Sequence, residues 1–310
     1  MKVLITGIHG FVGSNMVRSL QKDYTIYGLD IVSDHLEGVK KIYAWNDLFS
    51  ITDIDIIIHL AGKAHDVKNI SLAKEYFEIN TELTKKIYDW FLESSAQKFI
   101  FFSTVKAVAD VVNDGFLTED VDAKPVGPYG MSKRDAELYI LSKKINQSAK
   151  QTYILRPTMI HGKGNKGNLN LLYEFVRKGI PWPLGAYENK RSFTSIDNLI
   201  FIIQNLIDHD IEGGVYQIAD DDAISTRDLI AIISETLNKP TRIWDINKSL
   251  INFLALVGSK LNLPFNQERV KKLTENYIVS NEKIKKAIGI QKMPVATVEG
   301  LTKSIKSFIK

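Results

Sequence analysis

The stretch KVLITGIHGFVG, residues 2–13, decides the fold of this chain. It begins with a short apolar run that stops at Thr6, as a buried strand of a parallel sheet would. Gly7, Gly10 and Gly13 follow at three-residue spacing. This spacing allows a tight turn, close approach of a phosphate to the backbone, and close packing of the next helix on its strand. The unpaired N–H groups in the first turn of that helix make an anion site suited to a pyrophosphate.

An acidic residue follows at the distance that a dinucleotide site requires. Asp30 ends a second apolar strand, predicted at residues 25–30, and lies 20 residues past Gly10. A carboxylate there can accept hydrogen bonds from an adenosine ribose, and it would repel a 2'-phosphate, which favours NAD over NADP. Three glycines alone could be ordinary turns. The strand, the turn, the helix and the acid agree, so the stretch predicts dinucleotide binding.

The composition is that of an ordinary globular protein of about two domains. Of its 310 residues, 45% are hydrophobic and 25% are charged. The net charge of +4 is small and the lysines are scattered through predicted helices, so we expect no nucleic-acid partner. The absence of cysteine excludes disulfides and thiolate metal sites, and we predict no metal ion. Because the first strand begins at Lys2, we expect no secretory segment and a cytoplasmic enzyme.

A late apolar run at residues 250–257 is interrupted by Asn252 and is too short to span a bilayer. We interpret it as an amphipathic helix that packs in the core rather than one that lies on a membrane surface. We therefore predict no membrane insertion.

Strands and helices alternate along the rest of the chain. The predicted strands after the second one lie at residues 41–45, 55–60, 98–102, 152–155 and 215–219. This alternation predicts an α/β fold, a Rossmann-like doubly wound parallel sheet with a smaller C-terminal α/β substrate domain. We place the NAD-binding domain at residues 1–165, completed by part of residues 190–220. The substrate domain lies mainly at residues 166–310.

Two side chains four residues apart carry the predicted chemistry. Tyr129 and Lys133 share one face of a helix predicted to begin at Pro128. A phenol with a pKa near ~10 is a poor base, but an adjacent ammonium and a positive nicotinamide ring would favour its phenolate. Such a tyrosine can exchange a proton with a sugar hydroxyl while hydride moves to or from the cofactor. Thr104, which follows the strand at residues 98–102, can orient the same substrate oxygen.

Two motifs resemble the extended short-chain dehydrogenase/reductase family of NAD-dependent nucleotide-sugar epimerases and dehydratases. The first is the glycine turn TGIHGFVG, residues 6–13. The second is PYGMSK, residues 128–133, which is similar to the family's Pro-Tyr-Gly-x-Ser-Lys motif. The resemblance covers nearly the whole chain, but past residue 200 it names no sugar-recognition residue. It implies NAD as the cofactor and Thr104, Tyr129 and Lys133 as the catalytic triad.

The residues after Thr104 distinguish branches of this family. Where the 4,6-dehydratases carry Thr-Asp-Glu and use the two acids for elimination, this chain has Thr104-Val105-Lys106. The Ser-Thr-Val-Lys run resembles the branch of bacterial surface-polysaccharide enzymes that contains nucleotide-sugar 4-epimerases and 4-keto-reductases. The resemblance implies a 4-epimerase of a UDP-hexose or UDP-N-acetylhexosamine. An NAD(P)H-dependent UDP-4-keto-6-deoxy-sugar reductase and a catalytically silent nucleotide sensor remain alternatives.

The resemblance also implies which residues bind the cofactor. Asp47 and Leu48 are similar to the pair that contacts adenine, although Asp47 also suits a helix cap. Asn80 lies inside a predicted helix, where it either contacts the cofactor or faces solvent. The full cofactor set is Gly7, His9, Gly10, Phe11, Val12, Gly13, Asp30, Ile31, Asp47, Leu48, Leu60, Ala61, Gly62, Asn80, Ser103, Tyr129, Lys133 and Pro157.

A second set is expected at the nucleotide-sugar substrate. Arg191 resembles the family's diphosphate-binding arginine, and a guanidinium suits a diphosphate. Lys106 either faces the sugar or a phosphate, or pairs with Asp110. His59 is expected to be a core histidine, and His65 in the next loop either reaches substrate or is only a polar loop residue. The substrate set is Lys63, Thr104, Lys106, Tyr129, Asn168 and Arg191.

The helices predicted at residues 71–94 and 129–144 resemble the pair that builds a four-helix dimer interface in this family. An isologous contact needs only one self-complementary patch. The resemblance therefore implies a homodimer.

Overall fold

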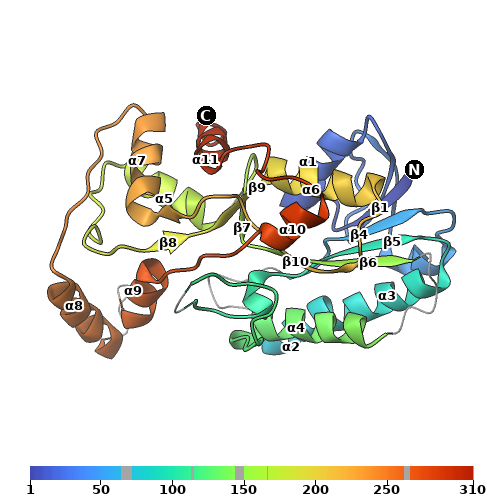
Figure 1. Ribbon diagram of the computed structural model, residues 1–310, viewed down its shortest axis with the longest axis horizontal. Coiled ribbons are helices and arrows are strands. Elements are labelled where there is room, and N and C mark those ends of the chain that lie inside the picture. Colours follow the sequence, from blue (N-terminus) through green and yellow to red (C-terminus); the bar gives the residue numbers. More distant parts are fainter. Residues whose placement is uncertain (64–71, 113–114, 144–149, 166, 262–265, 310) are drawn as a thin grey trace.

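A seven-stranded parallel sheet organises the fold (Figure 1). The computed structural model describes residues 1–63, 72–112, 115–143, 150–165, 167–261 and 266–309. The strand order is β10-β6-β5-β4-β1-β2-β3. The strands are β1 (Lys2–Thr6), β2 (Thr25–Leu29), β3 (Val39–Tyr43), β4 (Ile56–His59), β5 (Lys98–Phe102), β6 (Gln151–Pro157) and β10 (Gly214–Ile218).

The strand order reverses at β1. This strand pairs with β2, where Lys2 lies opposite Thr25, and with β4, where Val3 lies opposite Ile56. The chain first adds strands on the β2 side and then adds the rest beyond β4. The connection after β1 and the connection after β4 therefore lead to opposite sides of the sheet. In sheets of this kind, a ligand crevice forms between the carboxyl ends of two such strands. The predicted doubly wound parallel sheet is confirmed.

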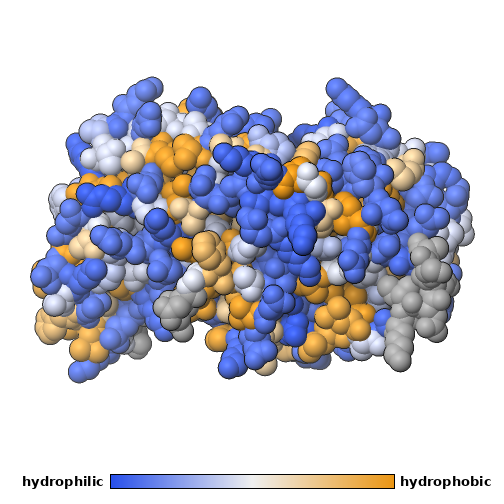
Figure 2. Space-filling model, viewed as in Figure 1, coloured by the Kyte–Doolittle hydropathy of each residue, from blue (hydrophilic) through white to orange (hydrophobic). Residues whose placement is uncertain are grey.

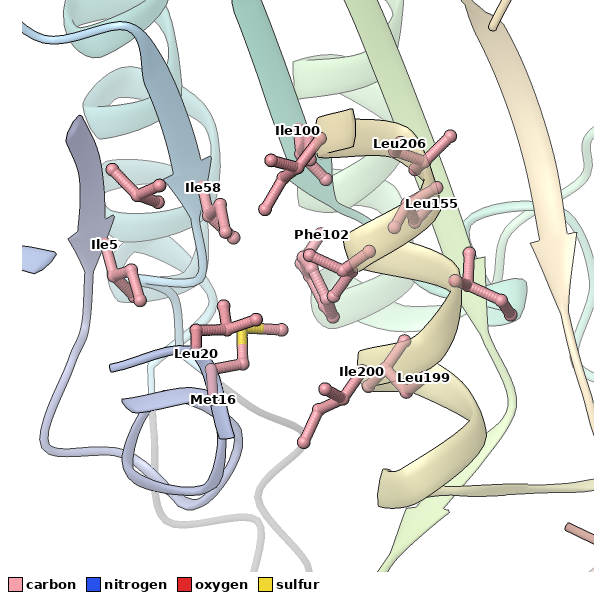
Figure 3. Close-up of a cluster of buried hydrophobic side chains, with 14 of the residues drawn as sticks. Ile5, Met16, Leu20, Ile58, Ile100, Phe102, Leu155, Leu199, Ile200 and Leu206 are labelled. Carbon is pink, nitrogen blue, oxygen red and sulfur yellow. The ribbon is translucent and has the colours of Figure 1, made fainter. Parts of the chain in front are cut away.

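Helices cover both faces of the sheet, as strands made of continuous apolar runs require. The covering helices are α1 (Phe11–Leu20) and α6 (Ile196–Asp208) on one face, and α3 (Leu83–Glu93) and α4 (Gly127–Ser142) on the other. In Figure 3, Met16 and Leu20 of α1 and Leu199 of α6 lie over the sheet residues Ile58 and Phe102. This packing holds the helix after the glycine turn firmly on β1.

The second half of the chain contributes to two cores. Its α6 and β10 complete the large sheet, and most of its other helices form a separate core at the other end of the molecule (Figure 1). The remaining helices are α5 (Asn168–Arg177), α7 (Thr226–Thr236), α8 (Lys248–Lys260), α9 (Gln267–Thr274), α10 (Glu282–Ala287) and α11 (Thr297–Lys306). Two small sheets pair β7 (Met159–His161) with β9 (Phe193–Ser195), and β8 (Lys190–Arg191) with β11 (Ile224–Ser225).

Two predicted elements have different limits in the structure. The strand predicted at residues 41–45 ends earlier, and Trp45 begins a 3-10 helix, η1 (Trp45–Ser50), in which Asp47 Oδ2 accepts the Ala44 N–H at 3.2 Å. The single helix predicted at residues 71–94 is α2 (Ala73–Tyr76), a π-helical turn η2 (Phe77–Glu82), and α3. Residue 71 lies outside the described residues.

The amphipathic helix predicted at residues 250–257 lies in α8. Ile251 and Ala255 are buried in a core, whereas Leu250, Phe253 and Leu254 are exposed, so the apolar residues are not all packed in the core. Within the part of the chain that the structure describes, no helix is long and apolar enough to cross a membrane.

Candidate active site

The glycine turn closes as tightly as the sequence predicted. Gly7 has a φ of +67°, and a Cβ there would lie 2.9 Å from the backbone of Ala61 after β4. A Cβ on Gly13 would lie 2.6 Å from the Ile8 carbonyl oxygen. Gly10 is the N-cap of α1, so the first N–H groups of that helix have no intrahelical partner. These features leave a narrow backbone cradle with free donors, which fits the pyrophosphate of a dinucleotide.

Asp30 lies against this turn at the carboxyl end of β2. Its Oδ2 accepts the His9 N–H at 3.0 Å, and its Oδ1 accepts the Ile31 N–H at 2.7 Å. His9 Nδ1 also lies 3.3 Å from Oδ2, whereas Oδ1 keeps a further acceptor site. The structure thus brings three residues of the expected cofactor set together, with the carboxylate held where it can accept ribose hydroxyls.

A hydrogen-bonded chain through His59 fixes the end of β4. Thr84 Oγ1 donates to the Asn80 carbonyl at 2.7 Å, so it accepts from His59 Nε2 at 3.0 Å. The other ring nitrogen, Nδ1, then accepts from Thr6 Oγ1 at 2.7 Å. Burial, and secondarily the positive charge of Lys133, lowers the His59 pKa to about 3. His59 is therefore a neutral core histidine, as predicted.

Asn80 ties the loop after β4 to the helix that carries Tyr129. Its Oδ1 accepts the Lys63 N–H at 2.8 Å, and its Nδ2 donates to Lys63 O and to Ser132 Oγ, both at 3.1 Å. Ser132 Oγ in turn donates to the Tyr129 carbonyl at 3.0 Å. Asn80 is fully buried in η2, so the solvent-facing alternative is wrong. His65 lies outside the described residues.

Tyr129 and Thr104 meet at the edge of the sheet. The Thr104 hydroxyl lies near enough to the Tyr129 phenol to influence its pKa, although α4 and the end of β5 are separated by a long connection. The ring of Tyr76 stands edge-on to that of Tyr129, with centroids 6.2 Å apart. Burial raises the Tyr129 pKa, the Thr104 hydroxyl opposes that shift, and Tyr76 adds to it.

Lys133 stands one helical turn after Tyr129, as predicted, but its ammonium is bound to the protein itself. Its Nζ donates to the Phe102 carbonyl at 2.8 Å, and a Cβ on Gly62 would lie 3.0 Å from that nitrogen. Burial lowers the Lys133 pKa to about 8, against the opposing charge of Glu137. The expected lowering of the Tyr129 pKa is thus not present in the protein alone, because desolvation of the phenol dominates.

Sequence reasoning missed a buried ion pair behind the triad. Glu137 accepts hydrogen bonds from Arg156 Nε at 2.8 Å, from its second guanidinium nitrogen at 2.6 Å, and from Ser103 Oγ at 2.5 Å. Ser103 therefore directs its hydroxyl to the buried Glu137, and its predicted contact with the cofactor stays a prediction. The available signal was an acid four residues after Lys133 on the same helix face.

The substrate set is only partly brought together. Lys106 Nζ pairs with Asp110 Oδ1 at 2.5 Å, as the ion-pair alternative held, and it also lies 5.1 Å from the ring of Tyr277. Tyr277 pairs through its backbone with Arg191, whose pKa is lowered by burial and raised by Glu275. Lys106 and Arg191 are thus both neighbours of Tyr277 beyond the triad, Lys106 through the ring and Arg191 through the backbone. Asn168 opens α5 at an exposed position, and its predicted contact stays a prediction.

Sequence comparisons place this chain among nucleotide-sugar enzymes. A model of the family described as NAD dependent epimerase/dehydratase matches residues 3–219. A Vibrio cholerae protein named UDP-glucose 4-epimerase is 31% identical over 322 aligned residues, covering 99% of this chain and 95% of the relative. An Escherichia coli O157:H7 protein named N-acetyl-alpha-D-glucosaminyl-diphospho-ditrans,octacis-undecaprenol 4-epimerase is 26% identical, covering 76% of this chain and 72% of the relative.

Solved structures agree on the fold. The UDP-glucuronic acid 4-epimerase from Bacillus cereus, in complex with UDP-glucuronic acid and NAD, is 20% identical with a TM-score of 0.76, covering 99% of this chain and 98% of that one. The UDP-glucose 4-epimerase of Thermotoga maritima, with UDP-glucose, is 20% identical with a TM-score of 0.74 and the same coverage.

Proposed function

The chain belongs to the NAD-dependent epimerase/dehydratase family, and on that basis we propose that it is a UDP-sugar 4-epimerase. It would oxidise C4 of a UDP-hexose or UDP-N-acetylhexosamine to a transient 4-keto sugar and reduce it from the opposite face. The observation that carries the proposal is the placement of Thr104 close to the Tyr129 phenol, one helical turn from Lys133 on α4. The Vibrio cholerae relative, whose name states a UDP-glucose 4-epimerase, supports the substrate class.

Each residue of the triad has one task in this proposal. The Tyr129 hydroxyl exchanges a proton with the C4 hydroxyl of the sugar. Thr104, whose hydroxyl lies near the Tyr129 phenol, orients the same oxygen. Lys133 keeps a buried positive charge on the same helix face. This charge favours the phenolate of Tyr129 and so opposes the effect of burial on its pKa. Because Val105 and Lys106 follow Thr104, the acid pair that elimination uses is not at these two positions.

NAD bound at the glycine turn would supply hydride acceptance from the sugar carbon and hydride return to it. The residues present fit this cofactor. Gly7 and Gly13 leave no room for side chains, and α1 offers unpaired N–H groups. Asp30 offers acceptors to a ribose, and its charge disfavours the 2'-phosphate of NADP. Residues 1–165, completed by part of 190–220, would form the NAD domain, and residues 166–310 mainly the substrate domain.

The substrate diphosphate would lie beside Lys106, whose ammonium is near the Tyr277 ring, and Arg191, whose backbone pairs with Tyr277. Lys63 and Asn168 are the further substrate residues that we propose. Lys63 pairs with Glu75 and lies 5.8 Å from the ring of Tyr76, next to Tyr129.

We further propose that the protein is a homodimer. The outer face of α4 exposes Met131, Leu138 and Leu141, and Ile79 of η2 is also exposed. The two elements pack against each other, so these side chains can form one apolar surface. A second copy would bury it by an isologous contact.

The test is to offer the purified protein UDP-hexoses, UDP-N-acetylhexosamines and a UDP-4-keto-6-deoxy sugar, while following both the sugar products and net nicotinamide oxidation. An epimerase interconverts one 4-epimer pair without net consumption of cofactor. Stoichiometric oxidation of reduced cofactor on the 4-keto sugar would show the reductase instead. Cofactor binding with no conversion of any sugar nucleotide would show a silent sensor.

A further inference from the structure

α8 has two apolar faces, and only one of them is packed. Ile251 and Ala255 are buried in the C-terminal core. The other face, which repeats at helical spacing, is open to solvent. It consists of Leu250, Phe253, Leu254 and, just past the helix, Leu261, which are 51%, 60%, 47% and 64% exposed. α8 lies at one corner of the molecule in Figure 1, and Figure 2 shows hydrophobic residues at that corner. Such an exposed apolar stripe marks an interaction site.

Basic residues border this stripe. α8 and α9 together carry five basic residues and one acidic residue, a formal charge of +4, which equals the charge of all 310 residues. Lys271 pairs with Glu275 at 3.4 Å. Among the described residues, Lys248, Lys260 and Arg269 are exposed and form no ion pair.

We propose that α8 docks this protein on the surface of an anionic lipid bilayer. The 13-residue helix would lie parallel to the surface, with its exposed stripe in the boundary of the acyl region and its lysines at the headgroups. Aliphatic and aromatic residues bordered by basic ones are the chemistry that such a surface recognises. Docking of this kind is peripheral and does not require a spanning helix.

A second copy of the chain is a poorer occupant of this face. An isologous contact through α8 would bring two clusters of charge +4 together, and like charges across an interface disfavour association. The apolar face of α4 offers self-association without that cost, since Arg134 pairs there with Glu137 at 2.9 Å. Anionic lipid headgroups neutralise the cluster on α8 instead.

The test is flotation of the full chain with vesicles of phosphatidylcholine that contain about 30% phosphatidylglycerol, at low and high salt. We expect the protein to float with these vesicles, to float much less with pure phosphatidylcholine, and to be released by salt. Phe253→Ser with Leu254→Ser should reduce the bound fraction at least about tenfold. Lys248→Glu with Lys260→Glu should reduce it likewise.

Matched controls alter the same chemistry elsewhere. Val298→Ser removes an exposed aliphatic side chain of α11, and Lys22→Glu with Lys40→Glu changes the charge equally at exposed positions of the large-sheet half. Both should bind vesicles like the wild type. Circular dichroism and NAD titration of every variant separate docking from folding.

Three results would overturn the docking proposal: no flotation of the wild type, flotation independent of anionic lipid, or undiminished flotation of both α8 variants. A smaller solution mass of Phe253→Ser with Leu254→Ser than of the wild type would assign the face to a second copy. None of these results depends on whether the protein is an epimerase, because no sugar is present.

Discussion

Tyr129 carries the one oxygen on which the proposed proton transfer depends. Tyr129→Phe removes that oxygen and keeps the ring that packs against Tyr76, so folding and NAD binding should be retained. We expect kcat to fall about 10²- to 10⁴-fold with little change in KM, because the proton moves only in the transition state. Thr104→Val should lower kcat by less than Tyr129→Phe does, since Thr104 orients the substrate oxygen without taking the proton. Near-normal turnover of Tyr129→Phe on a confirmed substrate would disprove the mechanism.

The buried charge of Lys133 should lower the stability of the folded protein, although the proposed mechanism needs this residue. Burial lowers its pKa to about 8 from 10.5, so the folded state loses the proton at a lower pH than the unfolded state. The cost of the buried charge is full below pH 8, and stability is regained as pH rises from about 8 to 10.5. Lys133→Met removes this cost at pH 7.

Part of that gain is offset by the lost hydrogen bond to the Phe102 carbonyl. We expect Lys133→Met to raise the free energy of unfolding at neutral pH by about 1–3 kcal/mol, while abolishing turnover. Urea unfolding without cofactor at neutral pH and above pH 9 measures this, and the gain should shrink at the higher pH. Lys22→Met, at an exposed lysine, is the control. A gain that does not depend on pH would refute the assignment to charge burial.

Asp30 combines a charge with a structural contact, and two substitutions separate them. Asp30→Asn keeps an acceptor for the His9 N–H but removes the charge, so it should chiefly improve NADP binding relative to NAD. Asp30→Ala removes both the acceptor and the charge, so it should also weaken NAD binding. Titration with both cofactors measures the two ratios. A wild type that already prefers NADP would contradict the role given to Asp30.

At the scale of elements, η2 links the loop after β4 to α4. Asn80→Asp keeps the acceptor for the Lys63 N–H but loses both donated bonds, which should loosen Gly62 and Lys63. We expect NAD affinity to fall about tenfold and the free energy of unfolding to fall by about 1–3 kcal/mol. Thr81→Val is the matched control, because within the described part of the chain the Thr81 hydroxyl donates only to the Ser132 carbonyl of α4. It should lower the free energy of unfolding but leave NAD affinity unchanged. If both variants lowered NAD affinity equally, the role of Asn80 in linking the loop after β4 to α4 would be refuted.

A second element, the extended segment at residues 276–280, holds the loop of Lys106 against β8. Tyr277 N donates to the Lys190 carbonyl at 2.9 Å, and its hydroxyl donates to the Ala109 carbonyl at 2.7 Å. Leu117 N donates to the Ile278 carbonyl at 2.8 Å. The C-terminal part of the chain thereby fixes the connection that follows Thr104, which would otherwise be a long loop open to solvent.

At the scale of the whole molecule, the dimer rests on the apolar face of α4. Leu138→Glu with Leu141→Glu places charges at its centre and should yield a monomer, measured as the solution mass at micromolar concentration. Val298→Glu, an equally exposed position on α11, should leave the mass unchanged. A wild type that is already monomeric would contradict the proposed interface.

The sequence alone determined which residues start each part of the fold. The strand, glycine turn and helix at residues 2–20, the acid at residue 30, and the four-residue spacing of Tyr129 and Lys133 are local patterns, and the structure has each of these elements. Local periodicity and turn chemistry suffice for such patterns, because the contacts that they specify lie within a few residues. The sequence did not predict the boundaries near residues 45 and 77–82. There the Asp47 carboxylate accepts the Ala44 N–H, and Asn80 is buried, and these contacts override simple periodicity.

The tertiary structure decided everything that joins residues far apart in the chain. The neutral state of His59 depends on Thr84, the buried charge of Glu137 depends on Arg156, and the direction of the Tyr129 pKa shift depends on how fully the surrounding residues exclude water. The sequence also did not predict the exposure of Phe253. The pattern of an apolar helix is the same whether its second face is packed or exposed to solvent. Packing and desolvation are properties of the folded neighbourhood, and no local pattern records them.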